Sequence, residues 1–92
     1  MRIIGNIDHP TLKITVFKMD NKLSVKFETG LYEQTFKFRE SDELNDFATM
    51  QQLVDEQLVN EVMENFAKMH HSKNEALGRF LPKAKVEFEE II

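Results

Sequence analysis

Histidine is the first residue type to consider for chemistry, because the chain has no cysteine and so no thiolate ligand or nucleophile. The imidazoles are His9, His70 and His71. Neighbouring residues on a helix project about 100° apart, so His70 and His71 do not form the i, i+4 pair of helical zinc sites. His9 falls in a predicted loop. We therefore expect no metal and no cofactor, and we interpret the histidines as exposed groups or local caps.

The other reactive side chains also lack the spacing of a catalytic site. Carboxylates are scattered over predicted helix surfaces and the C-terminal tail, and no serine has the glycine-flanked elbow of a hydrolase nucleophile. With three glycines in all, there is no phosphate-binding loop. A small chain built from one sheet and one long helix has little room for an enclosed pocket. The sequence thus predicts a protein that is not an enzyme.

Composition and charge narrow the class of protein further. Ninety-two residues, 41% hydrophobic and 30% charged, are typical of one globular domain. Residues 1–40 carry seven Lys/Arg and five Asp/Glu, whereas residues 41–92 carry five and eleven, which gives the net charge of −4. This acidic total argues against non-specific duplex binding but leaves a local basic surface in the first half. Apolar runs are too short for a membrane span or a signal peptide, so we expect a cytoplasmic protein.

The elements that position these groups begin with three runs of alternating polar and apolar residues. Period-two alternation is typical of half-buried antiparallel strands. Turn-forming pairs separate the runs at residues 20–21 and 29–30. The apolar face that the alternation defines carries Leu12, Ile14, Val16, Leu23, Val25, Phe27, Tyr32, Phe36 and Phe38.

A further strand is predicted at residues 2–7, ahead of these three. In the predicted pairing Gly5 lies opposite Ile14, and Ile3 lies opposite Val16 on the buried face. Gly5 has no side chain there, which leaves room for a helix to approach closely. The four strands make an antiparallel meander over residues 2–38.

After residue 40 the apolar residues recur at helical spacing. Ser41 followed by two acids predicts the start of a short helix. Thr49 and Gln52 match a capping box, which predicts a long amphipathic helix from about residue 50 to 70. The apolar pattern resumes beyond it at residues 76–81, where Gly78 is expected to end or bend the helix and Pro82 to stop it.

The tail alternates again at residues 84–88, which predicts either a short fifth strand or a frayed end. The predicted fold class is therefore α+β: a four-stranded antiparallel β-meander followed by one short and one long amphipathic helix packed on one face. We expect a single domain over residues 1–92. It comprises the meander at 1–39, a helical part at 41–81 and a tail or edge strand at 83–92.

Two surfaces are candidates for binding. The apolar stripe of the long helix is wider than one sheet face needs. Its surplus residues, Val59, Met63 and Phe66, predict self-association, so the expected partner is a second copy in a homodimer or another protein.

The alternative is the outer, polar face of the sheet. Phe17 is a large apolar residue on that face, where an aromatic ring among lysines could stack single-stranded bases. The predicted pairing places Lys13 opposite Glu28 and Lys26 opposite Glu33, which neutralises part of the charge. The residues of this possible nucleic-acid surface are Lys13, Phe17, Lys22, Lys26 and Lys37.

Two resemblances complete the analysis. The segment Gly30 to Phe38, the opening Ile3-Ile4-Gly5 with His9-Pro10, and the pair Met69-His70 resemble a family of small uncharacterised bacterial proteins of similar length. That resemblance implies no activity and no site residues. The order of four meandering strands and a helix is similar to that of the single-stranded-DNA-binding transcriptional coactivators, which pair through their helices.

Overall fold

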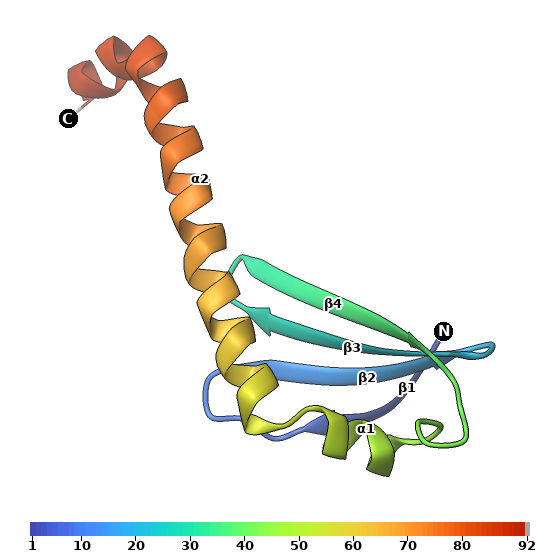
Figure 1. Cartoon of the computed structure of the whole chain (residues 1–92). Helices are drawn as coiled ribbons and strands as arrows, with labels where there is room; N and C mark the ends of the chain where they lie inside the picture. The colour runs from blue at the N-terminus through green and yellow to red at the C-terminus, as the bar shows by residue number, and fades with distance from the viewer. Residues whose placement is uncertain (92) are drawn as a thin grey trace.

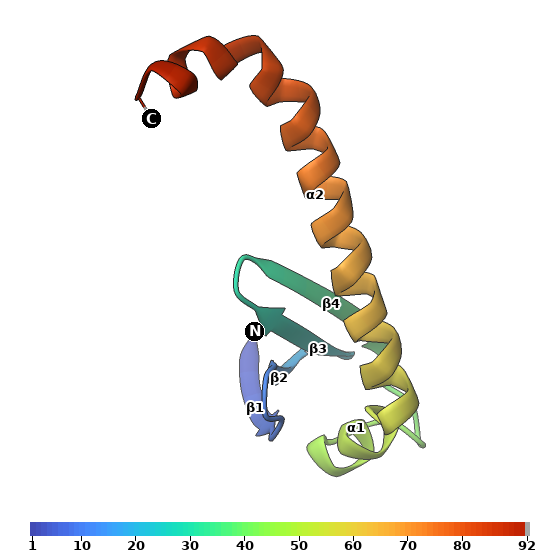
Figure 2. The same ribbon diagram turned by 90° about the vertical axis from the view of Figure 1, so that its left-hand side faces the viewer.

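The computed structural model describes the backbone of residues 1–91 and the side chains of residues 1–81. Four antiparallel strands lie side by side in chain order: β1 (Arg2–Ile7), β2 (Lys13–Met19), β3 (Lys22–Thr29) and β4 (Tyr32–Arg39). Two helices follow, the short α1 (Phe47–Leu53) and the long α2 (Glu56–Ile91). Figures 1 and 2 show both helices beside the sheet and the second half of α2 projecting well beyond it. The predicted α+β meander is confirmed.

The core lies between the predicted apolar face of the sheet and the two helices. Its largest fully buried side chain is Phe27, whose ring meets that of Phe36 edge to face at 5.9 Å. Gln34 joins the layers, since its amide donates a hydrogen bond to the backbone oxygen of Val62 in α2 (2.9 Å). The buried apolar residues are Leu12, Ile14, Val16, Leu23, Val25 and Phe27 from the sheet side, and Met50, Val54, Val62 and Phe66 from the helical side.

The two later hairpins share one turn geometry. Between β2 and β3, Asp20 and Asn21 form the predicted two-residue turn, and Asp20 has φ +53°. Between β3 and β4 the residue with positive φ is Gly30, at +54°, and it also occupies the first turn position. Glycine adopts that conformation freely, so the turn is Gly30-Leu31, one residue later than predicted.

This later turn changes which residues face each other across β3 and β4. The register moves by two residues, so the buried face is unaffected. On the outer face, however, Lys26 pairs with Thr35, and Glu28 pairs with Glu33. The predicted Lys26–Glu33 pairing is therefore wrong.

The pairing of β1 with β2 also differs from the prediction, because β1 contains a bulge. Gly5 pairs with Val16, two residues further along β2 than predicted, and the register then shifts between Ile3 and Gly5. A bulge adds one residue and so reverses which face the following side chains occupy. Ile4 packs against the core, whereas Ile3 pairs with Phe17 and is 60% exposed. The prediction that Ile3 is buried is wrong for this reason.

Gly5 has the role that its position predicted, and the helix next to it is α1. A Cβ atom on Gly5 would lie 2.4 Å from Cε1 of Phe47, the first residue of α1. The absent side chain therefore allows α1 to lie directly against β1.

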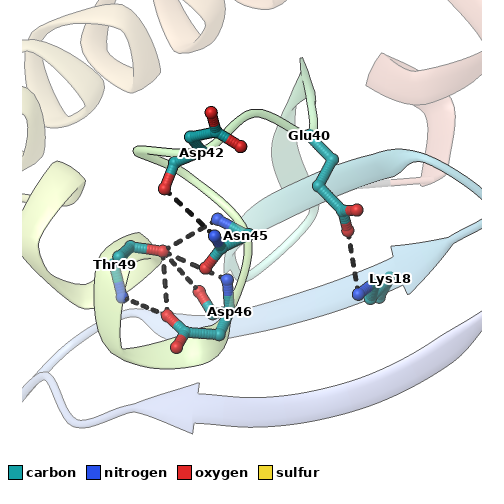
Figure 3. Close-up of polar contacts among 6 residues, drawn as sticks. All are labelled: Lys18, Glu40, Asp42, Asn45, Asp46 and Thr49. Atoms are coloured by element: carbon teal, nitrogen blue, oxygen red, sulfur yellow. Dashed lines mark hydrogen bonds and ion pairs between the residues drawn. The ribbon is translucent and has the colours of Figure 1, made fainter.

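Helix α1 begins at Phe47, later than the start predicted at Ser41, because the capping group is Asp46. The Asp46 carboxylate accepts a hydrogen bond from the backbone N–H of Thr49 (2.8 Å), and the Thr49 hydroxyl oxygen accepts one from the backbone N–H of Asp46 (3.1 Å; Figure 3). Thr49 is thus the third residue of a capping box and not its first. The hydrogen bond from the Thr49 backbone, with that from its side chain, lowers the pKa of Asp46 from its ordinary value of 3.8.

Helix α2 begins after a break at Val54 and Asp55, not near residue 50. The Asp55 carboxylate accepts a hydrogen bond from the backbone N–H of Leu58 (2.8 Å) and so caps the new helix. α2 then continues through Gly78 and Pro82, so the prediction that Pro82 stops the helix is wrong. An exposed glycine such as Gly78 costs a helix only about 1 kcal/mol.

The long helix also replaces the fifth strand. Residues 84–88 are helical, because α2 has by then carried the chain away from both edges of the sheet (Figure 1). Their side chains lie outside the described residues. Within the part of the chain that is described, no helix has both the length and the hydrophobicity needed to span a membrane.

Candidate interaction surfaces

The three residues predicted to form an interaction surface on α2 have different environments. Phe66 is 6% exposed and its ring lies 6.5 Å from that of Tyr32, so it belongs to the core. Val59 is half-buried against the core, and Met63 is 43% exposed. The prediction is wrong for Phe66, because Val62 and Phe66 form the middle of the stripe that faces the sheet. Met63 remains an exposed member of the predicted interaction surface.

Met63 borders a shallow open groove between α2 and the β3–β4 turn, which we call the hairpin groove. Its floor is mainly carbon, and Leu31 at the tip of the hairpin is 85% exposed. No sequence pattern indicates this groove, because it depends on where α2 crosses the hairpin. The groove is lined by Thr29, Gly30, Leu31 and Tyr32 from the hairpin, and by Met63, Phe66, Ala67, His70 and Lys73 from α2.

Hydrogen-bond contacts join two lining residues of the groove, Tyr32 and His70. The Tyr32 hydroxyl lies 2.8 Å from Nδ1 of His70, and the Asn74 amide nitrogen lies 3.1 Å from Nε2 of the same ring. Each ring nitrogen of His70 therefore lies within hydrogen-bond distance of a partner in the same chain. The Lys73 ammonium lies 5.2 Å from the centre of the Tyr32 ring. His70 is therefore a structural link between sheet and helix.

The other histidines make local contacts, as predicted. Nδ1 of His9 accepts hydrogen bonds from the backbone N–H groups of Thr11 (3.1 Å) and Leu12 (3.0 Å). His71 lies 3.4 Å from Glu75 one turn along the exposed side of α2. Within the side chains that the structure describes, no three His, Asp or Glu residues are grouped so that they could hold a metal ion.

The second surface is the part of α2 that extends past the sheet, residues 74–81, which we call the projecting segment. All its side chains are exposed, including the apolar Leu77 (41%), Phe80 (62%) and Leu81 (37%). At about 100° per residue, Phe80 lies on the same side of the helix as Val62, eighteen residues earlier. The stripe that packs on the sheet thus continues where there is no sheet beneath it.

The third surface is the outer face of the sheet, opposite the helices. Phe17 is half-buried there, and the Lys26 ammonium lies 5.4 Å from the centre of its ring and 3.4 Å from Glu28. Lys13, which was predicted to belong to the nucleic-acid surface, pairs across the strands with Glu28 and lies apart from the other predicted residues.

The observed register separates the charges on this face. Glu28 and Glu33 lie side by side near one end, whereas the rows near the other end contain no acid. We call those two rows the basic end of the sheet. Sequence reasoning missed two of its members, Ile3 because of the bulge and Arg39 because it falls at the last position of β4. The rows are Ile3, Phe17, Ser24 and Lys37, and then Met19, Lys22 and Arg39.

No family model, curated protein or solved structure matches this chain.

Proposed function

We propose that this protein is a non-enzymatic interaction module that self-associates through α2. The observation that carries the proposal is the projecting segment, where Phe80 continues the sheet-packing side of the helix, Leu77 and Leu81 lie beside it, and all three are exposed. The hairpin groove and two other hollows on the described surface are open. An open hollow suits contact with a macromolecule better than enclosure of a substrate.

Energetics support a partner for this segment. Most of the stability of a helix in a protein comes from packing of its apolar side, and a helix without such packing is marginal in water. Burying a Leu or Phe side chain fully gains about 1.5–3 kcal/mol, and a symmetric dimer buries each residue twice. Association of two copies would therefore stabilise the projecting segment as well as hold the copies together.

Sedimentation equilibrium at micromolar concentration tests the proposal. We expect the wild-type chain to be a dimer and Leu77→Glu to shift it towards monomer, because a carboxylate would be buried in the contact. Ser72→Glu is the matched control: it adds the same charge about 140° around the helix from Leu77 and should leave the mass unchanged. A wild-type chain that stays monomeric throughout would refute self-association.

A second candidate function is binding of single-stranded nucleic acid at the basic end of the sheet. The separation of charge supports it, since Lys37 shares a row with Phe17, Lys22 and Arg39 lie in the next row, and neither row contains an acid. Phe17 would stack on a base, and the cations would contact phosphates.

Fluorescence anisotropy with a labelled single-stranded oligonucleotide at low salt tests this candidate. A stacked base contributes about 1–3 kcal/mol, so Phe17→Ala should weaken binding by about tenfold or more. Lys13→Ala, which removes a cation beside the acids, should have much less effect. Absence of binding at low salt, where the electrostatic attraction is strongest, would exclude it.

A further inference from the structure

One side of α2 has the spacing of a coiled-coil seam. The intervals between successive members are 4, 3, 4, 3 and 4 residues, which is the alternation of core positions in a heptad repeat. This seam lies about 100° around the helix from Val62, so it is beside the sheet-packing stripe and not part of it. Its members are Met63, Ala67, His70, Asn74, Leu77 and Leu81.

The two halves of the seam have complementary surroundings. Met63, Ala67 and His70 line the hairpin groove, which is mainly carbon and open on its outer side. Leu77 and Leu81 belong to the projecting segment and are exposed. The first half is a hollow without an occupant, and the second half is an apolar ridge of similar length.

We infer that α2 packs antiparallel against α2 of a second copy, so that the projecting segment of each chain lies in the hairpin groove of the other. This inference rests on the proposed self-association and specifies its geometry. Because the seam is symmetric about residue 72, antiparallel packing pairs Met63 with Leu81 and Ala67 with Leu77. It also places the exposed Leu31 beside the partner's projecting segment.

The sizes and polarity of the paired residues favour this direction. A small residue, Ala67, meets a large one, Leu77, as close packing of facing layers requires. His70 meets Asn74, so polar groups pair in the middle and apolar groups at both ends. Parallel packing would instead place each residue against its own copy, including Ala67 against Ala67, and would leave both grooves without the ridge.

The polar layer of His70 and Asn74 in the middle of the seam can be buried by the second helix at a low cost in free energy. Both ring nitrogens of His70 already have partners within the same chain, Tyr32 and Asn74, so contact with a second helix leaves neither without a hydrogen bond. A polar layer inside an otherwise apolar seam also fixes the register of the two helices.

Charge favours the same direction. On one side of the centre at residue 72, residues 56–71 carry three acids and one base, a charge of −2, whereas on the other side residues 73–88 carry four bases and two acids, a charge of +2. Antiparallel packing places these unlike halves side by side, and parallel packing would place like halves together. The distribution of charge along α2 therefore selects a copy running in the opposite direction.

Disulfide cross-linking tests the geometry. Because the chain has no natural cysteine, only the introduced cysteines can form a disulfide. Met63→Cys and Leu81→Cys are prepared separately, one with a size tag, and then mixed and oxidised. We expect the mixed disulfide and no disulfide in either variant alone, because two copies of residue 63 would be about 27 Å apart along the helices. Ser72→Cys, on the far side of α2, should not cross-link.

Each other outcome overturns the inference in a distinguishable way. Disulfides within each variant alone would show parallel packing, with self-association intact. A sample that sedimentation shows to be dimeric but that forms no disulfide would place the interface elsewhere. A monomer would refute the proposed function itself. Ala67→Cys mixed with Leu77→Cys tests the neighbouring layer, should one of the first variants fold poorly.

Discussion

Replacing Gly5 with alanine is the most direct test of how α1 packs on the sheet. The added methyl carbon would lie 2.4, 2.6 and 2.7 Å from three carbons of the Phe47 ring, whereas carbon atoms in contact are normally about 3.5–4.0 Å apart. The overlap exceeds 1 Å, so either the ring leaves its site or α1 moves away from β1.

Overpacking of this kind costs about 1–3 kcal/mol. A domain of this size has a total unfolding free energy of about 5–10 kcal/mol, so the loss would be easy to measure by urea denaturation followed by circular dichroism. We expect Gly5→Ala to lower the denaturation midpoint clearly.

A double-mutant cycle identifies the cause. Phe47→Ala alone should cost about 2 kcal/mol, less than a fully buried phenylalanine because the ring is half-buried. Once the ring is gone, Gly5→Ala should cost almost nothing, which gives a coupling of at least 1 kcal/mol between the two sites.

The control is Gly78→Ala, since a Cβ at Gly78 meets nothing within 4 Å. It should be neutral or slightly stabilising, because alanine favours a helix over glycine by about 0.5–1 kcal/mol. If the effects at Gly5 and Phe47 were additive, or if Gly5→Ala were neutral, our account of this contact would be refuted.

Three further outcomes are expected from two buried side chains and the helix cap. Thr15→Val should raise the unfolding free energy by about 1 kcal/mol, because the Thr15 hydroxyl is buried without a hydrogen-bond partner; a loss of stability on urea denaturation would contradict this. Phe27→Ala should lower the unfolding free energy by about 3–5 kcal/mol in the same assay, since Phe27 is the largest fully buried side chain. A loss below about 1 kcal/mol would show that the core does not lie around Phe27. The lowered pKa of Asp46 means that its ionised form is favoured in the folded state, so its contribution is complete above pH 3.8 and is lost as the pH falls through the lower, folded-state pKa. The difference in stability between wild type and Asp46→Asn should therefore shrink on acidification, and a difference that grows would contradict the cap.

The local chemistry of the chain determined which face of the sheet is buried. Side chains alternate strictly along a strand, so the positions of Val16, Val25 and Phe36 on one face follow from residue types alone. The two-residue turn at Asp20 and Asn21 is also local, because Asp20 tolerates the positive φ that the turn needs at its first position. The space beside Gly5 was predictable for the same reason.

Pairing and packing over longer distances decided the candidate surfaces. Moving a turn by one residue keeps every side chain on its face, so the alternation could not distinguish a Lys26–Glu33 pair from the observed Glu28–Glu33 pair. The bulge that turns Ile3 outward likewise depends on the partner strand. Acids on the outer face are therefore grouped together, which the sequence alone did not reveal.

In helix α2, too, residue types determined one property and packing determined another. Its apolar spacing indicated an amphipathic helix, but that spacing is satisfied by more than one rotation of the helix about its axis. Only docking against β4 determined that Phe66 is buried while Met63 stays exposed. The direction in which α2 leaves the sheet likewise follows from the Asp55 cap and its packing, and this direction leaves Leu77 and Phe80 without a sheet beneath them. Residue types determine which side chains favour burial, but which of them are buried depends on where separate elements pack together.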